Sequence, residues 1–276
     1  TVTDNESPTI TAPADVAVNT DASSCDATGV TLGSATTADN CGVASVTNDA
    51  PAVFPLGTTT VTWTVTDNAG LTATDTQIIT VTDNESPTIT APADVAVNTD
   101  VSSCDATGVA LGSATTADNC GVASVTNDAP AVFPLGTTTV TWSVTDNAGL
   151  TATDTQVVTV TDNESPTITA PADVAVNTDA SSCDATGVAL GSATTADNCG
   201  VASVTNDAPA VFPLGTTTVT WTVTDNAGLT ATDTQVVTVT DNEAPTITAP
   251  VDVAVNSDAS SCDATGVALG SATTAD

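Results

Sequence analysis

The sequence predicts an all-β protein made of tandem β-sandwich domains, and three observations support this prediction. A unit of 79 residues recurs along the chain without insertions. Within each unit, short segments alternate apolar and polar residues, as half-buried strands do. Valine and threonine favour strands, whereas the prolines and glycines between the segments break helices and mark turns.

The repeat sets the expected domain organisation. The stretch TDNESPTITAP begins at Thr3 and returns at Thr82 and Thr161, and TDNEAPTITAP begins at Thr240. Internal repeats of this kind define structural units. The chain contains no Met, and it stops at SATTAD where earlier copies continue NCG, so we expect a segment of a longer array. The expected units are the end of a preceding repeat at 1–3, complete repeats at 4–82, 83–161 and 162–240, and a partial repeat at 241–276.

Each complete unit is long enough for a small domain with its own core. We expect strands at 30–34, 43–48, 59–66 and 71–81 in the first unit. The segment TTTVTWTVTD alternates strictly, which places Val61, Trp63 and Val65 on a buried face and the intervening threonines on the other. About seven short strands joined by turns are typical of an immunoglobulin-like sandwich. We expect these sandwiches to be arranged as a rod.

The composition excludes several classes of function. The 276 residues include 33 acids but no Lys, Arg or His, for a formal charge of −33. Nucleic-acid binding needs cationic side chains against phosphate, so we expect no nucleic-acid partner. No apolar run approaches the roughly 20 residues of a membrane helix, so we expect no membrane insertion. Because His, Lys, Arg and Tyr are absent, most catalytic side chains are missing, and we predict that the chain is not an enzyme.

Five segments cover nearly the whole unit: PTITAPADVAV, SSCDATGV, TADNCGVASVT, VFPLGTTTVTWTVTDNAG and TATDTQIITVTD. In these segments the unit resembles the hyalin repeat family of immunoglobulin-like extracellular modules. The resemblance implies an extracellular, non-enzymatic module that is used in tandem for adhesion or matrix assembly, as in large bacterial surface adhesins. One departure is that the family pattern usually has four cysteines per unit. Here two are present, and the missing ones would fall at Ala12 and Asp75.

The cysteines form one pair per repeat, with fifteen residues between the two members. Such pairs indicate disulfides and an oxidising compartment. Cys262 would have its partner two residues beyond the end of the chain. The alternatives are reduced pairs and disulfides between neighbouring repeats, for example Cys25 with Cys120, whereas the absence of His argues against zinc. We expect Cys25–Cys41, Cys104–Cys120 and Cys183–Cys199.

Acidic clusters are predicted to meet at one end of each sandwich. In an immunoglobulin-like sandwich, the loops around residues 39 and 67 lie at the same end as the N-terminal linker. Carboxylate and amide oxygens are the ligands that Ca²⁺ prefers. The linker also resembles the Asp-Asn-Pro junctions of cadherins, although the spacing differs. The alternative is ordinary turn chemistry with solvated acids. The expected ligands are Asp4, Asn5, Glu6, Asp39, Asn40, Asp67 and Asn68, then Asp83, Asn84, Glu85, Asp118, Asn119, Asp146 and Asn147, then Asp162, Asn163, Glu164, Asp197, Asn198, Asp225 and Asn226, and finally Asp241, Asn242 and Glu243.

These features predict a structural stalk or spacer in a long cell-surface protein of the adhesin type, stiffened by Ca²⁺ at the junctions between repeats. The expected partners are neighbouring repeats of the same chain, and a cell surface or matrix glycan reached through domains outside this segment. Two alternatives differ in class. The repeats could bind a glycan or partner surface directly, or like chains could pair along strand edges into a filament.

Overall fold

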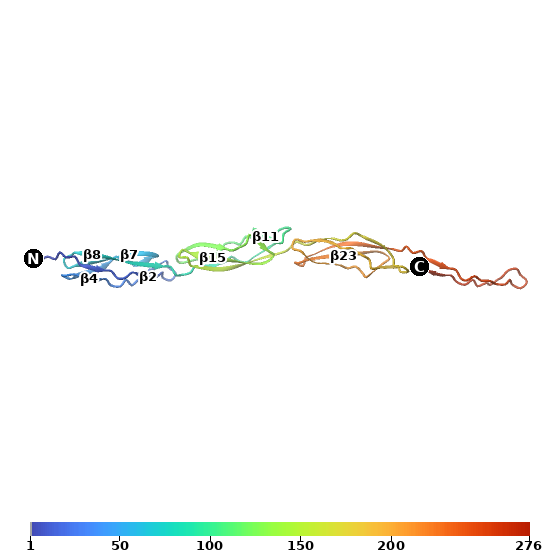
Figure 1. Ribbon diagram of the computed structural model, residues 1–276, viewed down its shortest axis with the longest axis horizontal. Coiled ribbons are helices and arrows are strands. Elements are labelled where there is room, and N and C mark those ends of the chain that lie inside the picture. The colour runs from blue at the N-terminus through green and yellow to red at the C-terminus, as the bar shows by residue number, and fades with distance from the viewer. Residues whose placement is uncertain (1) are drawn as a thin grey trace. The chain divides into compact units, whose positions relative to one another are not determined.

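The computed structural model describes residues 2–276, and every regular element in that range is a β-strand (Figure 1). The predicted fold class, tandem immunoglobulin-like β-sandwiches, is confirmed. No helix among these residues has the length and apolar character needed to cross a lipid bilayer. Each complete repeat contains eight strands in the same order, one more than predicted.

The strands have the following bounds. The first repeat contains β1 (Thr9–Thr11), β2 (Val16–Asn19), β3 (Asp26–Thr28), β4 (Thr36–Ala38), β5 (Val43–Asn48), β6 (Val53–Pro55), β7 (Gly57–Asp67) and β8 (Thr72–Thr82). The second contains β9 (Thr88–Thr90), β10 (Val95–Asn98), β11 (Asp105–Thr107), β12 (Thr115–Ala117), β13 (Val122–Asn127), β14 (Val132–Pro134), β15 (Gly136–Asp146) and β16 (Thr151–Thr161). The third contains β17 (Thr167–Thr169), β18 (Val174–Asn177), β19 (Asp184–Thr186), β20 (Thr194–Ala196), β21 (Val201–Asn206), β22 (Val211–Pro213), β23 (Gly215–Asp225) and β24 (Thr230–Thr240), and the partial repeat contains β25 (Thr246–Thr248) and β26 (Thr273–Ala275).

The chain divides into two compact units. The first comprises residues 1–97 and 105–161, and the second comprises residues 98–104 and 162–276. The loop 98–104 therefore belongs to the second unit although it lies within the second sequence repeat. The predicted repeat boundaries at 82/83, 161/162 and 240/241 stay predictions, but each complete repeat has one hydrophobic core cluster.

A four-stranded sheet forms one layer of each complete repeat, with the order β2-β8-β7-β5 in the first. The two long strands β7 and β8 pair antiparallel, from Gly57 opposite Val81 to Thr66 opposite Thr72. Strand β2 runs parallel to β8, which brings Asn19 beside Thr82. The short pairs β1–β4 and β3–β6 supply side chains to the opposite side of the core.

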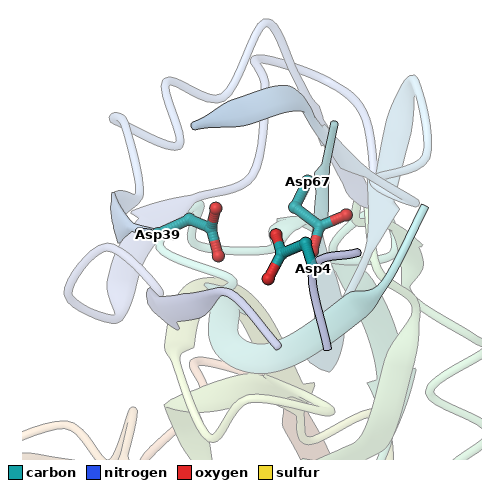
Figure 2. Close-up of side chains that lie close together, drawn as sticks. All are labelled: Asp4, Asp39 and Asp67. Atoms are coloured by element: carbon teal, nitrogen blue, oxygen red, sulfur yellow. The ribbon is translucent and has the colours of Figure 1, made fainter. Parts of the chain in front are cut away.

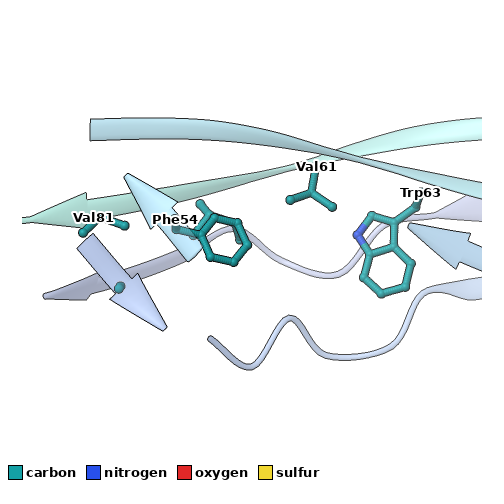
Figure 3. Close-up of a cluster of buried hydrophobic side chains, with 6 residues drawn as sticks. Phe54, Val61, Trp63 and Val81 are labelled. Carbon is teal, nitrogen blue, oxygen red and sulfur yellow. The ribbon is translucent and has the colours of Figure 1, made fainter. Parts of the chain in front are cut away.

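The core of the first repeat confirms the predicted alternation along β7. Val61, Trp63 and Val65 are buried, and the threonines between them lie on the outer face. Figure 3 shows the Trp63 ring and the Phe54 ring along the sheet face that Val61 and Val81 share. Burying one large aromatic side chain of this kind contributes about 1.5–3 kcal/mol.

A buried glutamine beside each tryptophan was not anticipated from the sequence. Gln77 is fully buried, and its Oε1 accepts a hydrogen bond from the Trp63 indole N–H at 3.1 Å. Its amide nitrogen donates to the carbonyls of Ala14 at 2.6 Å and Leu32 at 2.9 Å. Since every polar atom of the amide has a partner, the side chain ties two loops to the sheet. Gln156 and Gln235 make the same contacts.

The prediction of a strand at 30–34 is wrong. The strand in this region is β3, which ends at Thr28. Gly29 and Gly33 both have positive φ, at 62° and 87°, so the backbone between them turns and does not extend. The carbonyl of Leu32 bonds Gln77 instead of a neighbouring strand.

The two positions where the hyalin pattern has further cysteines are neighbours in space. Asp75 accepts a hydrogen bond on Oδ2 from the backbone N–H of Ala12 at 2.8 Å. This bond and a second one from the Thr76 N–H lower the pKa of Asp75 below its ordinary value. The same bond recurs between Asp154 and Ala91 and between Asp233 and Ala170. A charge-assisted hydrogen bond therefore joins the two positions at which the hyalin pattern has its additional cysteines.

Candidate metal centre

Three aspartates from separate parts of each complete repeat converge at one end of the sandwich. In the first repeat, Asp4 lies in the linker before β1, Asp39 follows β4, and Asp67 ends β7. Figure 2 shows their carboxylates facing a common centre, and one oxygen from each lies within 4.8 Å of the others. The same arrangement recurs in Asp83, Asp118 and Asp146, and in Asp162, Asp197 and Asp225. We call these groups the first, second and third Asp sites.

In each carboxylate, one oxygen accepts a hydrogen bond from a backbone N–H, and the other oxygen accepts none. At the second Asp site, the satisfied oxygens accept from the backbone N–H groups of Glu85 at 3.1 Å, Cys120 at 2.8 Å and Leu150 at 2.8 Å. The other oxygens, Asp83 Oδ2, Asp118 Oδ1 and Asp146 Oδ2, are buried without any hydrogen-bond donor. Asp146 as a whole is only 2% exposed. Buried acceptors without hydrogen-bond partners destabilise the folded state, and the repulsion between neighbouring negative charges destabilises it further.

A divalent cation is the group that this donor set fits. Two oxygens bound to one Ca²⁺ at about 2.3–2.6 Å lie no more than about 5 Å apart. The three carboxylate oxygens, within 4.8 Å of one another, meet that requirement. Hard anionic oxygen ligands suit Ca²⁺ better than zinc, which prefers nitrogen and sulfur. Asp83, Asp118 and Asp146 would hold the ion.

The remaining predicted ligands have different places. Asn68 donates through Nδ2 to the carbonyl of Cys41 at 2.9 Å, so it braces the loop behind the site. Asn147 and Asn226 do the same. Asn5 and Asn84 are exposed. In the partial repeat, Asp241 Oδ1 accepts a hydrogen bond from the Glu243 N–H at 2.9 Å. None of the three-aspartate groups among the described residues includes Asp241.

Asn119 and Glu85 connect the second Asp site to the loop 20–25 of the preceding repeat. Asn119 donates through Nδ2 to the carbonyl of Ser24 at 2.8 Å, and its Oδ1 is buried without a partner. Glu85 accepts a hydrogen bond from the backbone N–H of Ser23 at 2.9 Å. Ser23 holds a left-handed φ of 60°, which is uncommon for a residue other than glycine. The loop carries no motif of its own apart from the paired serines, so its contact with the site was not predicted from the sequence.

The predicted disulfides within repeats are wrong. Cys25 bonds Cys120, and Cys104 bonds Cys199, each with 4.8 Å between Cα atoms. These bonds join neighbouring repeats, as in the alternative pairing. Cys41, Cys183 and Cys262 are free and exposed.

Topology explains the pairing. Strand β2 runs parallel to β8, so both strands end at the same end of the repeat. There the Thr20 N–H donates a hydrogen bond to the Thr82 carbonyl at 2.9 Å. Cys25 follows in this loop. Cys41 lies at the other end of the sheet, beside Asp67, about 30 Å away along an eleven-residue strand. A disulfide needs Cα atoms within about 7 Å, so the two cysteines of one repeat cannot bond.

The free Cys41 thiol lies beside the first Asp site. Partial desolvation, followed by the negative charges of Asp4, Asp39 and Asp67, raises the pKa of this thiol. The equivalent cysteines of the second and third repeats, Cys120 and Cys199, are in disulfides.

Comparison with known proteins gives no family assignment. No protein-family model matches the chain, and no curated protein matches it. Among solved structures, the chain is similar to mouse cadherin-23 repeats EC22–24 (14% identity, 86% of this chain and 100% of that chain, TM-score 0.38). It is also similar to protocadherin gamma B7 repeats EC3–6 (12%, 90% and 77%, 0.39) and Drosophila N-cadherin EC1–4 (10%, 85% and 76%, 0.34). These similarities are too distant to assign a family or a function.

Proposed function

We propose that this chain is a spacer segment of a long extracellular surface protein, in which Ca²⁺ at the Asp sites stiffens the junctions between hyalin-type repeats. The observation that carries the proposal is the set of buried, donorless carboxylate oxygens that recurs at each Asp site. Disulfides are typical of oxidising compartments, which supports an extracellular location.

Other acids of the repeat accept hydrogen bonds from backbone and hydroxyl donors. Asp15 accepts a hydrogen bond from the Ile78 N–H at 2.8 Å, and Asp49 accepts one from the Thr62 N–H at 2.6 Å. Asp21 accepts from both the N–H and the hydroxyl of Thr28. Backbone and hydroxyl donors therefore stabilise these carboxylates, whereas each carboxylate of the Asp sites has one oxygen without a donor.

Thermal unfolding of the 276-residue chain in Ca²⁺ and in EGTA tests the proposal, together with small-angle scattering. Saturating Ca²⁺ at about 100 times Kd stabilises each site by about 2.7 kcal/mol, which raises the melting temperature. We also expect a longer particle in Ca²⁺. The unchanged chain is compared with a variant that carries Asp83→Asn and Asp162→Asn. This variant lacks one carboxylate at each of two sites. Identical melting curves and scattering in Ca²⁺ and EGTA would show that the Asp sites are solvated turns.

The two alternative functions have their own readouts on the same sample. Retention of the chain on a glycan surface would favour direct adhesion, and fibres in a concentrated solution would favour a self-assembling filament. Both stay predictions from the sequence.

A further inference from the structure

The cross-repeat disulfide and the second Asp site share one loop. Asp118, Asn119 and Cys120 are consecutive, and the Cys120 N–H donates to Asp118 Oδ2 at 2.8 Å. Cys120 is also the residue bonded to Cys25 of the preceding repeat. The residue that orients one carboxylate of the site is therefore covalently tied to the neighbouring repeat.

The preceding repeat also sets the orientation of the Asn119 amide. Nδ2 donates to the Ser24 carbonyl at 2.8 Å and contacts Asp83 Oδ1 at 3.3 Å. A flipped amide would set its oxygen against the Ser24 carbonyl, so the contact fixes which end carries the oxygen. Oδ1 is left buried and without a donor. The same Nδ2 therefore bridges the Ser24 carbonyl of the loop 20–25 and the Asp83 carboxylate of the site.

The second unit repeats this arrangement independently. Asn198 donates to the Ser103 carbonyl at 2.8 Å and contacts Asp162 Oδ1 at 3.3 Å. Its Oδ1 is again buried without a partner, and Cys199 is bonded to Cys104. At the first Asp site, where Cys41 is free, Asn40 is exposed and donates to Glu6 Oε2 at 2.9 Å instead.

We propose that each cross-repeat disulfide controls the cation affinity of the Asp site whose loop it anchors. This inference rests on the proposed cation sites. The disulfide ties Cys120, whose N–H orients Asp118, and it holds the loop 20–25 against Asn119, whose amide contacts Asp83. A dithiol reductant breaks the S–S bond by supplying two electrons and two protons, which leaves two thiols and an oxidised dithiol. The loop then separates from Asn119, and the site reverts toward the open form of the first Asp site.

The coupling is reciprocal because the cation and the disulfide act on the same state of the junction. If the disulfide raises Ca²⁺ affinity by some factor, saturating Ca²⁺ favours the disulfide over the dithiol by that factor. A tenfold coupling corresponds to about 30 mV in the reduction potential of a two-electron couple. The redox state and calcium concentration would therefore set the stiffness of the array together.

A matched pair of variants of the full chain tests the inference. Cys25→Ser with Cys104→Ser removes both cross-repeat disulfides and leaves every residue of the Asp sites unchanged. Cys183→Ser is the control, since Cys183 has the same flanking sequence but is free. We expect calorimetric titration with Ca²⁺ to show a loss of about tenfold to a hundredfold in affinity at the second and third sites of the double variant, as for groups that position metal ligands. The control should titrate like the unchanged chain.

Treatment of the unchanged chain with a dithiol gives a second measurement that needs no substitution. The reduced chain should match the double variant, and tryptophan fluorescence should show that the cores remain folded. Equal affinities in oxidised, reduced and variant chains would overturn the coupling while leaving the cation sites standing. Absence of Ca²⁺ binding in every sample, the control included, would overturn the cation sites and the inference together.

Discussion

The first and second Asp sites have identical aspartates but different surroundings. At the first, Asn40 and Cys41 are exposed. At the second, Asn119 and Cys120 are partly buried against the loop 20–25. The three carboxylates converge equally well in both. Each repeat therefore builds the anionic part of a site by itself, and its predecessor adds the covalent tie and the oriented amide.

The largest expected effect comes from removing one charge at the second Asp site. Asp146→Asn keeps an acceptor for the Leu150 N–H but lowers the ligand charge, and we expect Ca²⁺ affinity there to fall about a hundredfold. In EGTA the same change should stabilise the repeat, because it relieves repulsion among three close carboxylates. Melting curves in Ca²⁺ and EGTA should therefore shift in opposite directions.

The control for this variant is Asp128→Asn, since Asp128 accepts the Thr141 N–H at 2.6 Å outside the Asp site. Its melting temperature should change by the same amount in both conditions. Shifts of the same sign for Asp146→Asn in Ca²⁺ and EGTA would mean that no cation binds there.

A smaller effect separates Asn119 from Asn40. Asn119→Ala removes the bond to the Ser24 carbonyl and leaves that acceptor unpaired, which costs about 1–2 kcal/mol. Asn40→Ala should stay within about 0.5 kcal/mol, as is usual for surface positions. Denaturant unfolding of the two variants measures both values. Equal costs would show that the preceding repeat adds nothing at this position.

Glu85 and Glu6 provide a weaker contrast of the same kind. Glu85→Gln replaces the charge-assisted bond from the Ser23 N–H by a neutral one, at a cost of about 0.5–1 kcal/mol. The Glu6 carboxylate accepts a hydrogen bond from the exposed Asn40 side chain, so Glu6→Gln should have almost no effect. Chemical denaturation of the two variants would contradict this if their midpoints moved equally.

Acid unfolding should not distinguish the repeats. The folded pKa values of Asp75, Asp154 and Asp233 are lowered by backbone N–H bonds from Ala12, Ala91 and Ala170, and then from the following threonines. Their stabilisation is complete above the unfolded pKa of about 3.9 and is lost as the pH falls through the lower folded value. Replacing all three by Asn should flatten the loss of stability below about pH 4. Fluorescence-detected unfolding across that range measures the slope, and an unchanged slope would contradict the role of these bonds.

Local patterns in the sequence predicted the parts of the molecule that depend on local rules. The alternation around Trp63 identified the buried face of β7, and the turn residues placed Asp39 in a loop, whereas Asp67 is the last residue of β7. The disulfides depended instead on which end of the sandwich each loop reaches, and that follows from the parallel pairing of β2 with β8. The strand expected at 30–34 does not form, although the sequence pattern there is apolar. Gly29 and Gly33 have positive φ, which turns the backbone. The buried role of Gln77 was not predicted because its hydrogen-bond partners Ala14 and Leu32 lie far from it in the sequence.

Calcium titration of the oxidised 276-residue chain, after removal of EGTA, tests the central claim most directly. We predict three saturable sites, with the second and third tighter than the first because only those have the neighbouring amide and the disulfide. The absence of saturable binding up to about 10 mM Ca²⁺ would contradict this prediction. That concentration exceeds the largest dissociation constants usual for extracellular modules.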